Sequence, residues 1–240
     1  MDRIHRKELK QDKFALEVQH GLDIASSHRA ELIKWGGVAV AVLLLIGGIY
    51  AYSEHSKTER EAELQGAMRI QEAAVGAAAD SSAFVASFTT QAEKDQAATK
   101  AFTDILNKYP GKKEGAIARF YLGVINDDAG KQAEAEKFWK ANLDSGYDDV
   151  VSQTRLSLAQ LYEVQGNTGE AEKILRDLMA HPTIMVSKEQ ATIELARALS
   201  RTKPDEARKL LEPLRTERSA VSRMALTAYA EIGQSAPAAH

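Results

Sequence analysis

The longest apolar pattern in the chain is WGGVAVAVLLLIGGIYAYS at residues 35–53, a stretch without a charged side chain. A helix of this length covers about 28 Å at ~1.5 Å per residue, close to the ~30 Å hydrocarbon thickness of a bilayer. Trp35, Tyr50 and Tyr52 stand at its two ends, where aromatic rings prefer the headgroup level. The pattern predicts one transmembrane helix over residues 35–53.

Two other interpretations of this stretch are a buried core helix of a soluble protein and a cleavable signal peptide. The length and the terminal aromatic residues disfavour the first. A signal peptide has an apolar region of about 7–15 residues followed by small residues such as A-x-A. Tyr50, Ala51 and Tyr52 follow here without such a site. We therefore expect an uncleaved signal anchor.

The orientation of the anchor follows from Lys and Arg in its flanks, which favour the cytoplasmic side. The segment after the anchor is acidic, with Glu54, Glu59, Glu61 and Glu63. We expect the N-terminus in the cytoplasm and residues 54–240 exported. The basic residues before the anchor are Arg3, Arg6, Lys7, Lys10, Lys13, Arg29 and Lys34.

The N-terminal arm, residues 1–34, has the spacing of a short amphipathic helix at Phe14, Val18, Leu22 and Ala25. One interpretation is a solvated arm whose basic residues only fix the membrane orientation. The other is a docking helix that lies on the membrane surface or on a partner. The even mixture of acidic and basic residues favours the solvated arm.

A second pattern repeats through the exported part at a nearly constant period. Four alanines, Ala98, Ala135, Ala171 and Ala207, are spaced by 37, 36 and 36 residues. Such a period predicts stacked supersecondary units. A large apolar residue follows each alanine after four positions, namely Phe102, Trp139, Leu175 and Leu211. A further apolar residue follows after seven, namely Ile105, Leu178 and Leu214, with Asn142 as the exception.

A partner helix precedes three of these segments and carries a large residue followed by a small one. Gly130 and Gly166 fall seven positions after the small residue in two repeats, where glycine can end a helix in the left-handed conformation. Small residues let antiparallel helices approach closely, and each hairpin needs neighbours to bury its apolar face. The large and small pairs are Leu122-Gly123, Leu158-Ala159 and Leu195-Ala196.

The remaining segments complete an all-α chain. Residues 56–79 carry the stripe Leu64, Ala67, Met68, Gln71, Val75 and Ala78, which predicts a helix running directly out of the membrane as the opening of the first hairpin. A last helix at about 219–232 is expected to cover the open end of the stack. The predicted organisation is a cytoplasmic arm at 1–34, the anchor at 35–53, a membrane-proximal helix and linker at 54–91, the array at 92–232 and a flexible tail at 233–240.

The amino-acid composition is typical of a helical protein and argues against several classes of function. Gly and Pro number 15 and 5, and the net charge of -3 is too balanced for a nucleic-acid binder. The absence of cysteine excludes thiolate metal sites and disulfides. No histidine stands at metal-site spacing, and the pairs Asp127-Asp128 and Asp148-Asp149 lie in expected turns. Gly166-Asn-Thr-Gly169 lacks the Lys-Ser/Thr of a phosphate loop. We predict no enzyme activity, no cofactor, no metal and no small-molecule substrate.

These residues resemble the tetratricopeptide repeat (TPR). Leu122, Gly123, Ala135 and Trp139 match its pattern in one repeat. The matches in the next are Leu158, Ala159, Tyr162, Ala171 and Leu175. The large opening residue of the motif is replaced by Arg119, Arg155 and Thr192, so the repeats are divergent over roughly residues 92–218.

The TPR resemblance implies an α-solenoid of antiparallel hairpins whose first helices line a protein-binding groove. The groove lacks the Lys/Asn clamp that some TPR proteins use for a carboxylate. The positions that the family pattern assigns to the groove are Phe120, Val124, Asp127, Leu156, Gln160, Glu163, Ile193, Arg197 and Arg201.

The whole architecture is similar to the YfgM-type ancillary subunit of the SecYEG translocon. That resemblance implies a bacterial inner-membrane scaffold with a periplasmic array. The implied partners are translocon subunits, periplasmic chaperones or unfolded exported chains. The alternatives are a cell-envelope assembly or division adaptor with the same fold, and an enzyme with an unrecognised site.

Overall fold

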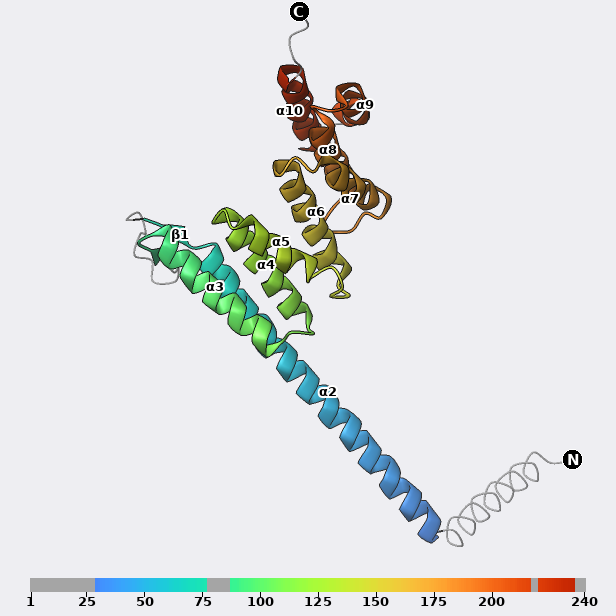
Figure 1. The fold of residues 1–240 in the computed structure, drawn as a ribbon. Coiled ribbons are helices and arrows are strands. Elements are labelled where there is room, and N and C mark those ends of the chain that lie inside the picture. Colours follow the sequence, from blue (N-terminus) through green and yellow to red (C-terminus); the bar gives the residue numbers. More distant parts are fainter. Residues whose placement is uncertain (1–28, 77–86, 217–219, 236–240) are drawn as a thin grey trace, which may run out of the picture. The chain divides into compact units, whose positions relative to one another are not determined.

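The computed structural model describes residues 29–76, 87–216 and 220–235 (Figure 1). The chain divides into two compact units, Met1–Glu59 and Arg60–His240. The predicted amphipathic arm around Phe14 and Val18 lies outside the described residues.

The predicted anchor is part of a single long helix, α2, which spans Arg29–Gln71. Its segment Lys34–Gln71 is long and apolar enough to cross a membrane by length and composition, with a mean hydropathy of 1.9 in its most apolar window. The helix runs without a break past residue 53, the predicted end of the anchor, to Gln71, as the sequence predicts.

The helix ends earlier than the predicted residue 79. Beyond Gln71 the chain turns and forms the two-residue strand β1, Ala74–Val75, which pairs in parallel with β2, Ser87–Phe88. Gly76 has a φ of 107°, a value that no right-handed helix contains. Val75 therefore leaves the predicted stripe and is exposed on β1, and Ala78 lies outside the described residues.

Within the described residues eight helices follow, and each packs against its neighbour in the chain (Figure 1). Their connections are short, which makes successive helices antiparallel neighbours. This is the predicted α-solenoid of helix hairpins. The helices are α3 (Gln91–Lys108), α4 (Lys113–Asp128), α5 (Gln132–Lys140), α6 (Asp148–Val164), α7 (Thr168–Ala180), α8 (Lys188–Leu199), α9 (Pro204–Arg215) and α10 (Ala220–Ser235).

The first hairpin consists of the end of α2 and α3. Ala67 of α2 is buried with Ala98 and Phe102 of α3 in one cluster that continues into α4. Arg60 Nε lies 3.3 Å from Glu114 Oε2 and ties the end of α2 to the first turn of α4. The exposed side chains of α2 thus give way to packed ones within the last turns of the helix.

Local signals place the helix ends. Thr90 and Ser187 cap α3 and α8, because their hydroxyls accept hydrogen bonds from the backbone N–H groups three residues later. Gly130 and Gly166 have φ values of 72° and 77° after α4 and α6. Both predicted glycine turns are confirmed, since only glycine adopts this conformation at little cost.

The repeating alanines are completely buried. Ala98, Ala135, Ala171 and Ala207 are all 0% exposed, and the large residues four positions later are equally buried. The predicted hairpin packing is therefore confirmed in all four repeats.

Asn142, the exception to the apolar pattern, is buried as completely as the residues that it replaces. Its Nδ2 donates hydrogen bonds to the carbonyl oxygen of Ala116 at 3.1 Å and to Thr154 Oγ1 at 3.0 Å. Both hydrogen bonds come from Nδ2 and join α4 to α6, whereas the buried Oδ1 of Asn142 has no hydrogen-bond partner among the described residues.

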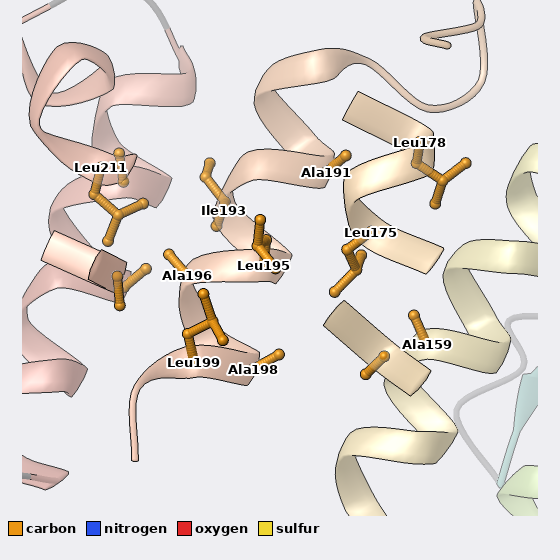
Figure 2. Packing of buried hydrophobic residues seen from close by; sticks show 14 of the residues in the cluster. Ala159, Leu175, Leu178, Ala191, Ile193, Leu195, Ala196, Ala198, Leu199 and Leu211 are labelled. Carbon is orange, nitrogen blue, oxygen red and sulfur yellow. The ribbon is translucent and has the colours of Figure 1, made fainter. Parts of the chain in front are cut away.

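Helix α8 is the most enclosed helix of the array. It packs on α6, α7, α9 and α10. Figure 2 shows Leu195, Leu199 and their neighbours on α8 between α7 and α9. Little of the surface of α8 therefore remains for a partner.

The predicted final helix is α10, and its buried residues Ala225, Ala228 and Ile232 cover α8 and α9. The helix continues to Ser235, so the prediction of a tail from residue 233 is wrong at its start. Burial of Ile232 at 0% exposure anchors the last turn. Residues 236–240 lie outside the described residues.

Candidate protein-binding face

The first helices of the hairpins form one continuous face. α4 packs on α6, α6 on α8, and α8 on α10, which takes the place of the first helix of a further repeat. We call this surface the first-helix face. Two cavities open on it near the C-terminal ends of these helices.

The first cavity, of about 270 Å³, lies between α4 and α6. Its apolar wall includes Val124 of α4 and Leu161 of α6, and its polar groups include Asp127. Burial raises the pKa of the Asp127 carboxyl, and the neighbouring charge of Asp128 adds to the effect. The complete lining is Val124, Asp127, Trp139, Ser157, Gln160, Leu161 and Val164.

The second cavity, of about 560 Å³, lies between the ends of α6, α8 and α10. Its floor holds a charged network around Arg197, whose Nη1 donates to Glu194 Oε1 at 3.1 Å and whose Nε lies 3.4 Å from Glu231 Oε2. Glu194 is only 8% exposed, so Arg197 neutralises a nearly buried carboxylate. The guanidinium of Arg197 is therefore engaged before any partner arrives.

Glu163 and Arg201 complete the charged lining of the second cavity. Burial raises the pKa of Glu163, and the charge of Glu194 acts in the same direction, while Arg197 and Arg201 oppose it. Arg201 is exposed and forms no ion pair within 4 Å in the part of the chain that the structure describes. It is the charged group of this cavity best placed to meet an anionic group.

Val164, the last residue of α6, lines both cavities and is 74% exposed. An aliphatic side chain between two cavities offers an apolar contact at the centre of the face. Sequence reasoning missed this residue, although its position directly before the Gln165-Gly166 turn places it at a helix end.

Six of the nine residues predicted for the groove line these cavities. Val124, Asp127 and Gln160 line the first cavity. Glu163, Arg197 and Arg201 line the second. The structure thus brings each set together from neighbouring helices, and whether they contact a partner stays a prediction.

The other three predicted residues lie elsewhere. Leu156 and Ile193 are core residues, exposed by 8% and 1%, and Phe120 is half-buried against the cluster of Trp139 and Leu158. The family pattern assigned all first-helix positions of one face to the groove. Packing on α8 from several neighbouring helices buries Ile193, and a single repeat pattern does not contain that information.

No metal-binding cluster of three or more His, Asp or Glu side chains occurs among the described residues. His181 Nδ1 lies 3.1 Å from Asp177 Oδ1 in the exposed turn after α7, and Arg155 Nη1 lies 2.7 Å from the other oxygen of that carboxylate. These contacts join α6 to the end of α7 and are structural in kind.

No protein-family model and no curated protein matches the chain. Among solved structures, the chain is similar to a protein from Podosopora anserina described as a kinesin light chain with nearly identical TPR-like repeats. The TM-score is 0.52 and the identity 17%, and the match covers 73% of this chain and 85% of that one.

The fold is therefore a TPR-like helical repeat array preceded by one long apolar helix. This class, the TPR-like array, describes the fold of the chain.

Proposed function

We propose that this chain is a membrane-anchored scaffold that holds segments of other proteins on its first-helix face. The observation that carries the proposal is the pair of cavities on either side of the exposed Val164. An exposed apolar residue between concave, partly polar surfaces suits an extended or helical segment of a partner.

The proposed topology places the N-terminus in the cytoplasm and the array in the periplasm. It rests on the basic residues before the apolar helix and the acidic residues after it. Because the natural chain has no cysteine, single cysteines can report the topology. Ala230→Cys, exposed on α10, should react with an impermeant maleimide added to spheroplasts, whereas Ser27→Cys should react only after the membrane is permeabilised. The reverse labelling pattern would contradict this orientation.

The proposed partners are subunits of the Sec translocon and periplasmic chaperones, together with exported chains that pass between them. This step rests on the resemblance of the architecture to the YfgM-type subunit. A cell-envelope assembly or division adaptor is the second candidate function, since the same anchor and array would serve it. An enzyme with an unrecognised site is the third.

Site-specific photo-crosslinking tests both the face and the partner. A benzophenone amino acid at Val164 should crosslink to translocon or chaperone subunits in intact membranes. The matched control is Lys173, which is exposed on α7 outside both cavities. Equal crosslinking from Lys173 would show that another surface binds. Enrichment of a division or envelope-assembly complex at Val164 would favour the adaptor.

A further inference from the structure

We infer that the cavity between α4 and α6 is a subsite for one Lys or Arg side chain of the segment that the scaffold holds. The inference rests on the proposed function, because it names the chemistry that the first-helix face selects. Four features of the cavity carry it: its apolar walls, its carboxylate, its position at two helix ends, and the contrast with the second cavity.

The walls of the cavity fit the stem of a basic side chain. Val124, Leu161 and Val164 are aliphatic, and Trp139 closes the cavity from α5. Lys and Arg bury their methylene stems along such surfaces while the charged head keeps polar contacts. A short polar side chain would leave these walls uncovered.

The polar end of the cavity offers a carboxylate without a cation. Asp127 lines the cavity, and neither Asp127 nor Asp128 forms an ion pair with a basic side chain within the described residues. Partial burial disfavours the ionised form of Asp127 and raises its pKa. A cation placed beside this carboxylate would remove that penalty, whereas an anion would increase it.

The C-terminal ends of two helices add to the negative electrostatic potential in the cavity. α4 ends at Asp128 and α6 at Val164, so the cavity lies at the negative ends of both helix dipoles. Neither helix has a basic residue in its last turn, while α8 has Arg197 and α9 has Arg215 there. Two carboxylates at the C-terminal end of α4 are unfavourable for the helix itself, and a cation from a partner would offset that cost.

The second cavity has a different charge character. Arg197 and Arg201 line it together with Glu163 and Glu231, so its lining carries both signs of charge and gives a basic side chain no net attraction, whereas the charged residue that lines the first cavity is Asp127. A segment with a basic residue in the first cavity and an apolar residue on Val164 matches both cavities. A segment in which an acidic residue replaces the basic one is rejected by Asp127.

Fluorescence anisotropy with the full chain in detergent tests the subsite. The probes are three labelled twelve-residue peptides with one leucine-containing background and Lys, Gln or Glu at the centre. We expect the Lys peptide to bind about tenfold more tightly than the Gln peptide, the size of a partly desolvated charge pair. Raising the salt concentration should weaken only the Lys peptide.

Asp127→Asn should abolish the preference for Lys and leave binding of the Gln peptide unchanged. Asp128→Asn is the matched control, because Asp128 is exposed and does not line the cavity. Thermal unfolding of Asp127→Asn should not fall below that of the natural chain, since the replaced carboxylate is unfavourably placed.

Equal binding of the three peptides, or binding of none of them, would overturn the subsite. If the peptides bind equally and Val164→Asp abolishes their binding, the scaffold face stands and its proposed selectivity is wrong. If photo-crosslinking from Val164 also captures no translocon, chaperone or envelope subunit, the proposed function itself fails.

Discussion

Replacement of Gly123 by alanine tests the close packing within the second hairpin. A Cβ atom at this position would lie 2.2 Å from Nε1, 2.6 Å from Cδ1 and 2.8 Å from Cε2 of Trp139. An ordinary contact needs about 3.5 Å. The indole must therefore move by more than about 1 Å, although it is buried and its Nε1 donates to the carbonyl oxygen of Phe120 at 3.2 Å.

The expected cost follows from three terms of known size. Overpacking a core costs about 1–3 kcal/mol, and loss of the indole hydrogen bond adds about 1 kcal/mol. Alanine gains about 1 kcal/mol over glycine inside a helix. The free energy of unfolding should fall by about 1–3 kcal/mol, which lowers Tm by several degrees in a domain of this size.

The matched control is Gly66→Ala in α2, where a Cβ would meet no atom within 4 Å. Only the helix propensity changes there, so we expect a gain of up to about 1 kcal/mol. The chain has two tryptophans, and Trp35→Phe would leave Trp139 as the only reporter of indole fluorescence. Urea unfolding followed by this fluorescence measures the second hairpin directly, which matters because repeat arrays can unfold in parts.

The other repeats supply a rescue experiment. Alanine stands at the position of Gly123 in the next two repeats, as Ala159 and Ala196, and leucine replaces Trp139 there. Gly123→Ala combined with Trp139→Leu should therefore be less destabilising than the sum of the two single changes, by about 1 kcal/mol or more. A neutral Gly123→Ala, or strict additivity of the pair, would refute the steric reasoning.

Three further predictions concern polar groups. Asn142→Leu restores the repeat pattern and should change the free energy of unfolding in urea by less than about 1 kcal/mol, because the loss of two hydrogen bonds is offset by removal of the buried Oδ1, which has no hydrogen-bond partner among the described residues; a loss of about 2 kcal/mol or more would contradict this. Hydrogen bonds from Lys203 and Arg176 lower the pKa of Glu172. The ion pairs of Glu172 contribute about 0.2–1 kcal/mol to the free energy of unfolding, the usual size for a surface pair. This stabilisation is fully present above the unfolded-state pKa of about 4.3. It is lost as the pH falls through the lowered pKa of the folded state. The stabilities of the natural chain and Glu172→Gln should thus differ at pH 7 and converge towards pH 3. Arg201→Glu should reduce crosslinking from Val164 with unchanged far-UV circular dichroism, since Arg201 is exposed; undiminished crosslinking would show that this cavity is not used.

Local chemistry made much of the fold predictable. The regular spacing of alanines from Ala98 to Ala207 indicates the positions where helices pack together. A small side chain is needed at these positions because it permits two helices to cross closely. Gly130 and Gly166 mark turns for an equally local reason, since their φ values are open to glycine alone at little cost. The apolar stretch at 35–53 is identified by its length and lack of charge.

The end of α2 and the burial of Ile193 depended on contacts between distant segments. The chain leaves the predicted helix after Gln71 and pairs β1 with β2, a contact that periodicity does not encode. Ile193 has the spacing of a groove residue, but its helix is enclosed by helices that lie before and after it in the chain.

The amino-acid sequence by itself determined the class of this protein: an apolar helix, then antiparallel hairpins stacked through buried alanines. Each of those features depends on residues within about forty positions of one another, so the apolar stretch and the repeat spacing along the sequence are enough to predict them. Only the tertiary structure decided where the surface is hollow. The cavities on either side of Val164 arise where the ends of α4, α6, α8 and α10 come together, and their charges come from residues far apart in the chain. Burial and electric field depend on all neighbours at once, which a repeat pattern does not specify.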